Sequence, residues 1–220
     1  MYTLYGGGVT RSLGPQMVLE EGGIPYTLKV VDELAGEHRA PDYLALNPTG
    51  TMPTLVTPEG AVMHEAPALM VYLAERHALE DLIPSVANPL RGLFFTKLFY
   101  HTNEILPPTG RFFRPERYST MAEHAPAIKA KAHADALDRW SLLDEFLAAH
   151  GPYHLGERFS LLDLHMTLWA AYGLETIGEL TDRFEAVGRC FALTVARPRI
   201  GPRIAALQGA MQQWRKAKAV

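Results

Sequence analysis

The sequence of 220 residues predicts an α/β domain followed by an all-helical domain. Before about residue 80, short strand-like runs alternate with helix-like runs, whereas the sequence after Pro89 shows only helical spacing and loops. This change in periodicity marks a domain boundary. We therefore expect an N-terminal domain over residues 1–79, a linker over 80–88 and a helical domain over 89–220.

The N-terminal domain begins with a strand, a glycine-rich loop and a helix. Residues 2–5 are β-prone and lead into three glycines. Ser12 is a candidate N-cap for a helix that runs to Glu21 and ends before two further glycines. The run YTLKVV at 26–31 then predicts a second strand.

The same domain continues with a short helical turn and a hairpin. PDYLAL at 41–46 predicts the turn, and 54–57 and 61–64 predict two brief strands joined by the turn sequence PEG. A helix over 67–77 closes the unit. The resulting order β, α, β, α, β, β, α within ninety residues is typical of a thioredoxin-like α/β layer.

The second domain is predicted from apolar stripes and a helix-start motif. Two stripes have helical spacing, one between Ile128 and Leu147 and one between Ile200 and Trp214. Ser160 and Asp163 form a capping box at the start of a further helix. Pro107 and Pro108 are expected to interrupt the helix that begins near Leu90 and to leave a loop, PPTGRFFRPERY.

Composition excludes several classes of partner. The formal charge is −3 and no run of like charges occurs, so neither nucleic acid nor an anionic membrane is expected as a partner. No stretch has the length of a transmembrane helix, and the N-terminus lacks a signal-peptide pattern. Cys190, the single cysteine, cannot form an internal disulfide and suits the reducing cytoplasm. We expect it to be a buried, inert thiol.

The histidines do not indicate a metal. His101 and His124 are scattered along the chain, and the remaining histidines show no HxxxH or similar spacing that warrants a metal hypothesis. No metal site is therefore expected.

The stretch NPTGTMPTL at 47–55 places Pro53 at the start of a strand, where it forfeits one ladder hydrogen bond. A cis bond between Met52 and Pro53 would turn the Met52 main-chain groups outward, where they can pair with an extended peptide ligand. An edge-strand proline in trans is the alternative. The residues alone leave this choice open.

Four segments together resemble the cytosolic glutathione S-transferases over nearly the whole chain. They are LYGGGVTRS with LEEGGIPY, GEHRAPDYLALNPTGTMPTL, HEAPALMVYLAERH and FSLLDL, in the family's order and spacing. The resemblance implies a cis Pro53, a Met52 main chain that holds the cysteinyl part of glutathione, and a homodimer. It also implies conjugation of glutathione, as co-substrate, to an electrophile.

A thiol with a pKa near 9 has to be deprotonated before it attacks at neutral pH, and a helix N-terminus favours that anion. The resemblance makes Ser12 the leading hydrogen-bond donor to the thiolate. Tyr5 is a competitor, because some classes carry a catalytic tyrosine at the end of this strand. Thr10 or Arg11 aligns with the loop cysteine of bacterial classes, which this chain lacks. That absence argues against thiol-reductase chemistry, and Arg11 would add positive potential.

Three further positions correspond to glutathione contacts of the family. Glu65 matches the residue that holds the γ-glutamyl amine, and His38 matches a histidine that approaches the glycyl carboxylate. Ala66 departs from the family's serine, so the hydroxyl contact to the γ-glutamyl carboxylate is lost. A hydrogen bond to a charged group contributes about 1.5–3 kcal/mol, so we expect affinity for glutathione to fall by about ten- to a hundredfold unless backbone N–H groups compensate.

The second substrate is expected between the domains, in an apolar pocket that suits a small hydrophobic electrophile. Its candidate lining residues are Val9, Phe99, Asn103, Phe112 and Phe113. Two alternatives to conjugation stay open: a glutathione-dependent isomerase, lyase or dehalogenase of the same fold, and a non-catalytic binding protein, which the departure at Ala66 would permit.

Overall fold

The computed structural model describes residues 1–218, and backbone contacts divide them into two compact units. The first unit contains Met1–Ile83 together with the segment from Val195 onward, and the second contains Pro84–Thr194. From the sequence, this last segment is expected in the helical domain. The domain limits at 79 and 89 remain a prediction.

A four-stranded mixed sheet forms the centre of the first unit, with strand order β2-β1-β3-β4. Strands β1 and β2 are parallel, and the β1–β3 and β3–β4 pairs are antiparallel. Leu4 of β1 and Leu55 of β3 are opposite each other and fully buried. The strands are β1 (Tyr2–Gly6), β2 (Tyr26–Val30), β3 (Thr54–Val56) and β4 (Val62–His64).

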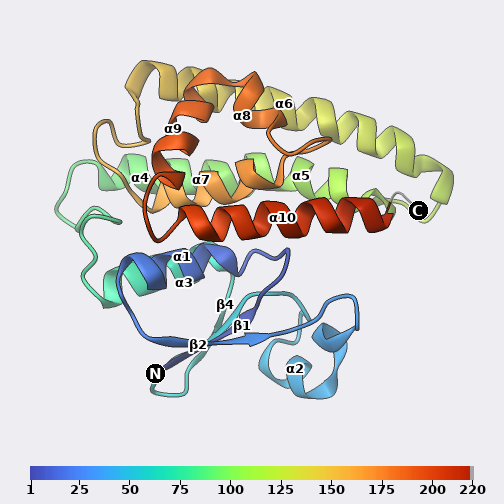
Figure 1. Cartoon of the computed structure of the whole chain (residues 1–220), viewed down its shortest axis with the longest axis horizontal. Coiled ribbons are helices and arrows are strands. Elements are labelled where there is room, and N and C mark those ends of the chain that lie inside the picture. Colours follow the sequence, from blue (N-terminus) through green and yellow to red (C-terminus); the bar gives the residue numbers. More distant parts are fainter. Residues whose placement is uncertain (219–220) are drawn as a thin grey trace. The chain divides into compact units, whose positions relative to one another are not determined.

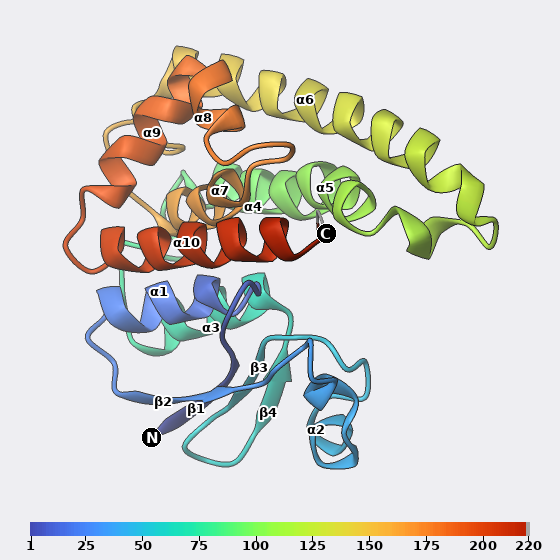
Figure 2. The ribbon, with the colours of Figure 1, turned by 45° about the vertical axis from the view of Figure 1, so that its right-hand side comes forward.

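Helices lie on both sides of this sheet. Figures 1 and 2 show α1 (Leu13–Glu21) and α3 (Ala66–Arg76) together on one side, and α2 (Pro41–Leu46) on the other. Apolar residues of α1 and α3, such as Met17 and Leu69, are fully buried. The predicted thioredoxin-like arrangement is confirmed, as is the hairpin turn, in which the Gly60 N–H donates to the Thr57 carbonyl at 2.9 Å.

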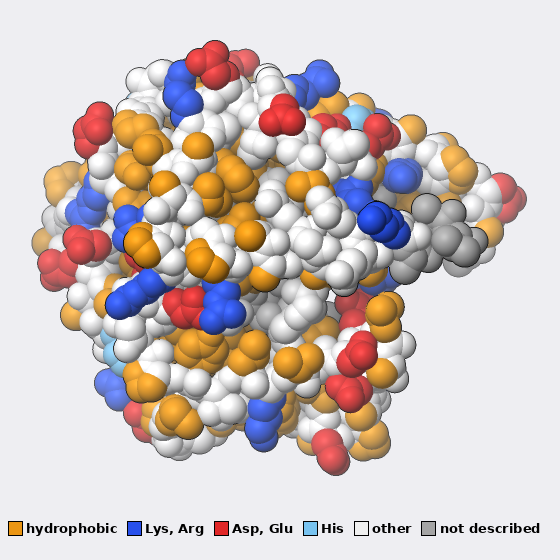
Figure 3. Space-filling model, viewed as in Figure 1, with side chains coloured by type: hydrophobic (Ala, Val, Ile, Leu, Met, Phe, Trp, Pro, Cys, Tyr) orange, Lys and Arg blue, Asp and Glu red, His pale blue; other side chains and the backbone are white. Residues whose placement is uncertain are grey.

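Helix α10 (Gly201–Lys218) begins close to the end of α1 in the same unit. The Arg199 guanidinium donates to the main-chain carbonyls of Glu20 at 2.5 Å and Glu21 at 3.0 Å, and so satisfies carbonyls that the last turn of α1 leaves without partners. Arg203 pairs with the Glu20 carboxylate at 2.7 Å. Figure 3 shows such opposite charges interspersed on one face.

The second unit is helical, apart from turns and isolated bridges. Its core is built around Trp140, Leu143 and Leu147 of α6, which are at most 2% exposed, as the apolar stripe predicts. The helices are α4 (Arg91–Tyr100), α5 (Leu106–Phe113), α6 (Ala125–His150), α7 (Leu161–Tyr172), α8 (Glu179–Arg183) and α9 (Glu185–Val195).

Pro107 and Pro108 do not end the helix, contrary to the expectation from the sequence. A π-helical turn over His101–Ile105 follows α4, and α5 begins directly after it. The Leu106 N–H donates to the His101 carbonyl, five residues back, in the wider register of a π-turn. The prolines therefore occupy the first turn of α5, where no N–H is required.

The capping box at the start of α7 is confirmed. The Ser160 side chain accepts the Leu162 N–H at 3.3 Å, and the Asp163 carboxylate accepts the Ser160 N–H at 2.7 Å. Among residues 1–218, no helix is both long and apolar enough to cross a membrane.

Candidate active site

The register of the sheet brings three segments to one of its ends. Tyr5 of β1 is opposite Thr54 of β3, which is opposite His64 of β4. Because both pairs are antiparallel, the neighbouring positions Gly6, Pro53 and Glu65 follow at the same end of the sheet. The glycine loop, the cis-proline segment and the start of α3 therefore converge in this unit.

The loop between β1 and α1 requires its glycines. Gly7 and Gly8 have φ angles of 96° and 57°, which side chains rarely adopt. At Gly6, a Cβ would lie 2.2 Å from the Ser12 Cβ. The loop can therefore approach Ser12 only because it carries no side chain at this position.

Ser12 does not cap α1 with its side chain, so the expected cap is wrong. It occupies the N-cap position, but its backbone is helical, with φ −62° and ψ −21°, and its hydroxyl makes no cap hydrogen bond. Instead the Ser12 Oγ accepts the Gly7 N–H at 2.8 Å. The side chain is 1% exposed, because tertiary contact with the glycine loop replaces the local cap.

Thr10 and Ser12 form a pair of hydrogen-bonded hydroxyls, in which Ser12 is the buried member and Thr10 is the more exposed one. The Thr10 Oγ1 donates to the Gly7 carbonyl at 2.8 Å and lies 2.7 Å from the Ser12 Oγ. Since the single Thr10 hydroxyl proton is directed to Gly7, the proton in the second contact comes from Ser12. Ser12 therefore donates to Thr10, and the half-exposed Thr10 is the outer hydroxyl of the pair.

The other two thiolate candidates lie apart from this pair. The Tyr5 ring is half-exposed, with its centroid 6.2 Å from that of Tyr43, and its hydroxyl accepts a hydrogen bond from Lys29 Nζ at 3.4 Å. Arg11 is half-exposed in the turn that begins α1. The structure thus brings Thr10 and Ser12 together and places Tyr5 against α2.

The Met52–Pro53 peptide bond is cis, as the resemblance implies. The Met52 side chain is 7% exposed and packs with Val31 and Tyr43. The Tyr43 hydroxyl holds the preceding Thr51 carbonyl at 2.7 Å. Within residues 1–218, the Met52 main-chain N–H and C=O have no hydrogen-bond partner, so both are available to a ligand.

Glu65 precedes α3 in an uncommon backbone conformation, with φ 68° and ψ 106°. A non-glycine residue in such a region costs about 1–3 kcal/mol and is found preferentially at functional sites. Glu65 is exposed, whereas Ala66, the first residue of α3, is only 2% exposed. A negative ligand group near Ala66 would meet the positive end of the α3 dipole.

His38 lies in the 3₁₀ turn Glu37–Arg39, which closely approaches the segment before Met52. A Cβ at Gly50 would be 2.9 Å from the His38 carbonyl oxygen. The His38 Nδ1 is buried and, in the described part of the chain, has no hydrogen-bond partner. The turn thus places His38 beside the cis-proline segment.

The candidate pocket residues have different surroundings. Val9 is half-exposed in the glycine loop. Phe112 is 4% exposed and belongs to the helical core. Phe99 is 58% exposed and stacks on Phe95. Asn103 is exposed in the π-turn, and Phe113 is half-buried against Tyr172.

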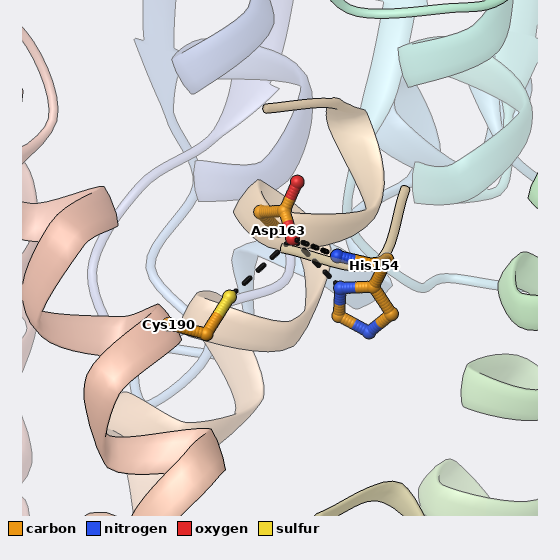
Figure 4. Close-up of side chains that lie close together, drawn as sticks. All are labelled: His154, Asp163 and Cys190. Atoms are coloured by element: carbon orange, nitrogen blue, oxygen red, sulfur yellow. Dashed lines mark hydrogen bonds and ion pairs between the residues drawn. The ribbon is translucent and has the colours of Figure 1, made fainter. Parts of the chain in front are cut away.

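Sequence reasoning missed a buried cluster in the helical unit (Figure 4). His154, Asp163 and Cys190 each offer an atom that could ligate a metal. However, Asp163 Oδ1 lies 2.8 Å from His154 Nδ1 and accepts the Cys190 thiol at 3.4 Å, so the cluster is hydrogen-bonded. Burial raises the pKa of the Cys190 thiol, as expected for an inert one. The capping box at Asp163 and the expected burial of Cys190 were the sequence signals that pointed here.

The fold defines a class of two-unit proteins in which a thioredoxin-like sheet unit is combined with a helical unit. Residues 11–76 match the family model described as glutathione S-transferase, N-terminal domain. The chain is 28% identical to glutathione S-transferase 2 of Anopheles gambiae over 89% of each chain. It is 31% identical to glutathione S-transferase 3 of Zea mays over 70% of this chain and 69% of that protein.

Two further similarities are shorter or structural. A maleylacetoacetate isomerase of Pseudomonas aeruginosa is 39% identical over 41% of this chain and 42% of that protein. A crystal structure of a glutathione transferase homologue from Sulfitobacter with bound glutathione has a TM-score of 0.82 and 24% identity, covering 92% of this chain and 96% of that one. The chain belongs to the glutathione S-transferase family of enzymes.

Proposed function

We propose that the protein conjugates the glutathione thiolate to a small hydrophobic electrophile. The observation that carries this proposal is the convergence of the glycine loop, the open Met52 main chain and the start of α3 at one end of the sheet. An extended tripeptide with a thiol in its centre matches that arrangement. Family membership supports the same co-substrate.

In the proposed complex, the Met52 main chain pairs with the cysteinyl residue of glutathione in the manner of an added strand. Glu65 receives the γ-glutamyl ammonium group, and the α3 N-terminus receives the adjacent carboxylate. His38 approaches the glycyl carboxylate. Because Ala66 has no hydroxyl, only the main-chain N–H groups of α3 remain for that carboxylate.

The thiolate is stabilised by the hydroxyl pair at the start of α1. Thr10 turns its proton from the Gly7 carbonyl to the sulfur, and Ser12 continues to donate to Thr10. Donation from Ser12 polarises the Thr10 hydroxyl and makes it a stronger donor. The α1 N-terminus adds about 0.3–1 kcal/mol for the anion, and Arg11 adds positive potential.

A direct test combines ligand binding with turnover. Purified protein should bind glutathione in calorimetry and conjugate it to an activated aryl halide, followed by absorbance. Replacing Met52 tests little, because its main chain rather than its side chain pairs with glutathione in the proposed complex. The informative variant is Glu65→Gln, and Glu59→Gln at an exposed position is the control. Binding that falls only in Glu65→Gln supports the proposal. A protein that binds no glutathione at millimolar concentration contradicts it and favours a non-catalytic binding protein.

Glutathione-dependent isomerisation is the second candidate, because the local match to a maleylacetoacetate isomerase has the higher identity of 39%. In such a reaction the thiolate adds to a conjugated double bond, the single bond rotates and the thiolate leaves. Glutathione would therefore not be consumed. Conversion of a cis-enone diacid without loss of free thiol would favour this reaction over conjugation.

We also propose a cytoplasmic homodimer that takes a small hydrophobic electrophile. Exposed Phe99, stacked on Phe95, fits a protein contact better than a ligand wall. Sedimentation of wild type and Phe99→Asp tests this assignment. A dimer in both, with unchanged dissociation, would contradict a role for Phe99 at the interface.

A further inference from the structure

Three buried histidines of the helical unit form one line of hydrogen bonds between Asp163 and Trp169. His154 Nδ1 lies 2.8 Å from Asp163 Oδ1, and His154 Nε2 lies 3.1 Å from His101 Nε2. His101 Nδ1 lies 3.3 Å from His165 Nδ1. The Trp169 Nε1–H donates to His165 Nε2 at 3.3 Å. The three imidazoles are at most 1% exposed.

The two ends of this line dictate where its protons lie. An indole N–H can only donate, so His165 Nε2 is an acceptor and its proton is on Nδ1. The His165 Nδ1–H donates to His101 Nδ1, which is therefore an acceptor. The His101 proton is then on Nε2 and is donated to His154 Nε2. The His154 proton is then on Nδ1, directed to Asp163, whose other oxygen accepts the Ser160 N–H and hydroxyl. Every imidazole is neutral, and every contact holds one proton.

One additional proton cannot be accommodated without breaking a contact. If the additional proton binds any of the three imidazoles, two N–H groups face each other across one contact. Moving a ring proton from one nitrogen to the other only transfers this clash to the next contact in the line. A clash between two of the buried histidines would leave donors without partners in the core, which is unfavourable. The Asp163 end is held by several donors, including the His154 main-chain N–H at 3.0 Å.

The Trp169 end is the place where the clash can be relieved. Trp169 is half-exposed, so its indole can turn its N–H toward water and replace the lost hydrogen bond. The contact between Trp169 and His165 is therefore the one that opens when the line takes up a proton.

The surroundings of His101 favour its neutral form. Burial, followed by His154, His165 and Lys97, holds the pKa of His101 well below its usual value. On α6, Arg139 is directed to Glu104 at 2.8 Å, on the exposed side of the π-turn. On α5, Arg111 acts on Asp135 of α6. The Asp163 carboxylate is the negatively charged group in direct contact with the line, through its hydrogen bond with His154.

We propose that His154, His101 and His165 form a proton relay that couples proton uptake in the core of the helical unit to the orientation of the Trp169 indole. Trp169 stacks on Tyr172, with ring centroids 5.4 Å apart, and Tyr172 contacts Phe113. Acidification thus changes an aromatic surface of this unit. The relay does not depend on the proposed conjugation.

The test follows the indole N–H resonance of Trp169 by ¹⁵N–¹H NMR from pH 8 downward, with Trp169→Phe used for assignment. The resonance should move toward the position of a water-exposed indole, with the same midpoint as the C–H resonances of the three histidines. Circular dichroism defines the pH range in which the protein stays folded. An indole resonance that stays constant over this range overturns the proposal.

Variants distinguish a relay from a response of His165 alone. His154→Gln leaves His165 and Trp169 in place and should shift the midpoint of the Trp169 response; an unchanged midpoint overturns the relay. If that variant does not fold, His101→Gln serves the same purpose. His165→Asn should give an exposed indole resonance at every pH. The surface control His124→Asn should leave the response unchanged, and an equal shift there would contradict a role for the buried line.

Discussion

The Ser12 hydroxyl donates to Thr10 Oγ1 across 2.7 Å, while its own oxygen accepts the Gly7 N–H at 2.8 Å. Both hydrogen-bonding functions of Ser12 are therefore used inside the loop. A thiolate at this position would meet the half-exposed Thr10 before it meets Ser12, which is 1% exposed. Thr10 is therefore the hydroxyl that we expect to contact the thiolate, and Ser12 is the hydroxyl that supports Thr10.

Thr10→Ala should lower kcat/KM for conjugation by about 10- to 150-fold, the equivalent of a hydrogen bond of about 1.5–3 kcal/mol to a charged group. Ser12→Ala should lower it less, because Thr10 stays in place. The thiol pKa of bound glutathione, read from the thiolate absorbance against pH, should rise in both variants. A larger effect of Ser12→Ala on this pKa would identify Ser12 as the contacting hydroxyl.

Gly6→Ala should impair activity although it alters no functional group. The new Cβ would lie 2.2 Å from the Ser12 Cβ and 2.4 Å from its Oγ, so the loop or the start of α1 has to move. Gly92→Ala in α4 is the matched control, since a Cβ there meets no atom within 4 Å. The control should be neutral or stabilising by up to about 1 kcal/mol. Equal losses of turnover in both variants would argue against steric displacement of Ser12.

Ala66→Ser should increase the affinity for glutathione by about ten- to a hundredfold, since it supplies a hydroxyl at the start of α3. Ala68→Ser, two residues further along α3 and exposed, provides the same chemical change at a position where we expect no contact with the ligand. Calorimetric titration measures both. Unchanged affinity in Ala66→Ser would show that the α3 main chain already satisfies the ligand carboxylate.

Much of the fold could be predicted from local patterns, because strand alternation, turn residues and the capping box act over few residues. The β1–α1–β2 order and the hairpin at Gly60 are examples. Local patterns failed where distant groups compete. Ser12 has the sequence of a cap, but Gly7 takes its hydroxyl, and the prolines at 107 and 108 continue a helix because a π-turn precedes them.

The histidine line could not be predicted for the same reason. His101 and His154 are 53 positions apart, and His165 is 64 positions from His101, so no spacing motif connects them. The cis bond at Pro53 was predicted by the resemblance of four segments to a known family, since the local residues left the choice between cis and trans open. The roles of the side chains in the candidate site remain predictions.

Asp163→Asn should destabilise the protein by about 2–4 kcal/mol, because a buried carboxylate that caps α7 would be replaced by a group with one acceptor fewer. The carboxylate accepts the Ser160 N–H at 2.7 Å and the His154 ring at 2.8 Å. Asp135→Asn removes an exposed partner of Lys131 and should change stability by less than about 1 kcal/mol. Urea unfolding compares the two, and similar midpoints would contradict the capping role.

Stability should decline as the pH falls below about 6.5, the ordinary pKa of histidine. Burial lowers the pKa of His101 in the folded protein, so between the folded and unfolded pKa values the unfolded chain binds the proton and the folded chain does not. The free energy of unfolding is therefore fully present above the unfolded value and decreases toward acid, by up to about 1.4 kcal/mol per pH unit for each such proton. It levels off once the pH drops below the folded value. Urea unfolding at intervals from pH 8 to pH 5 measures this slope, and His101→Gln should reduce it by the contribution of one proton. A slope that is the same in wild type and His101→Gln would assign the acid sensitivity to other groups.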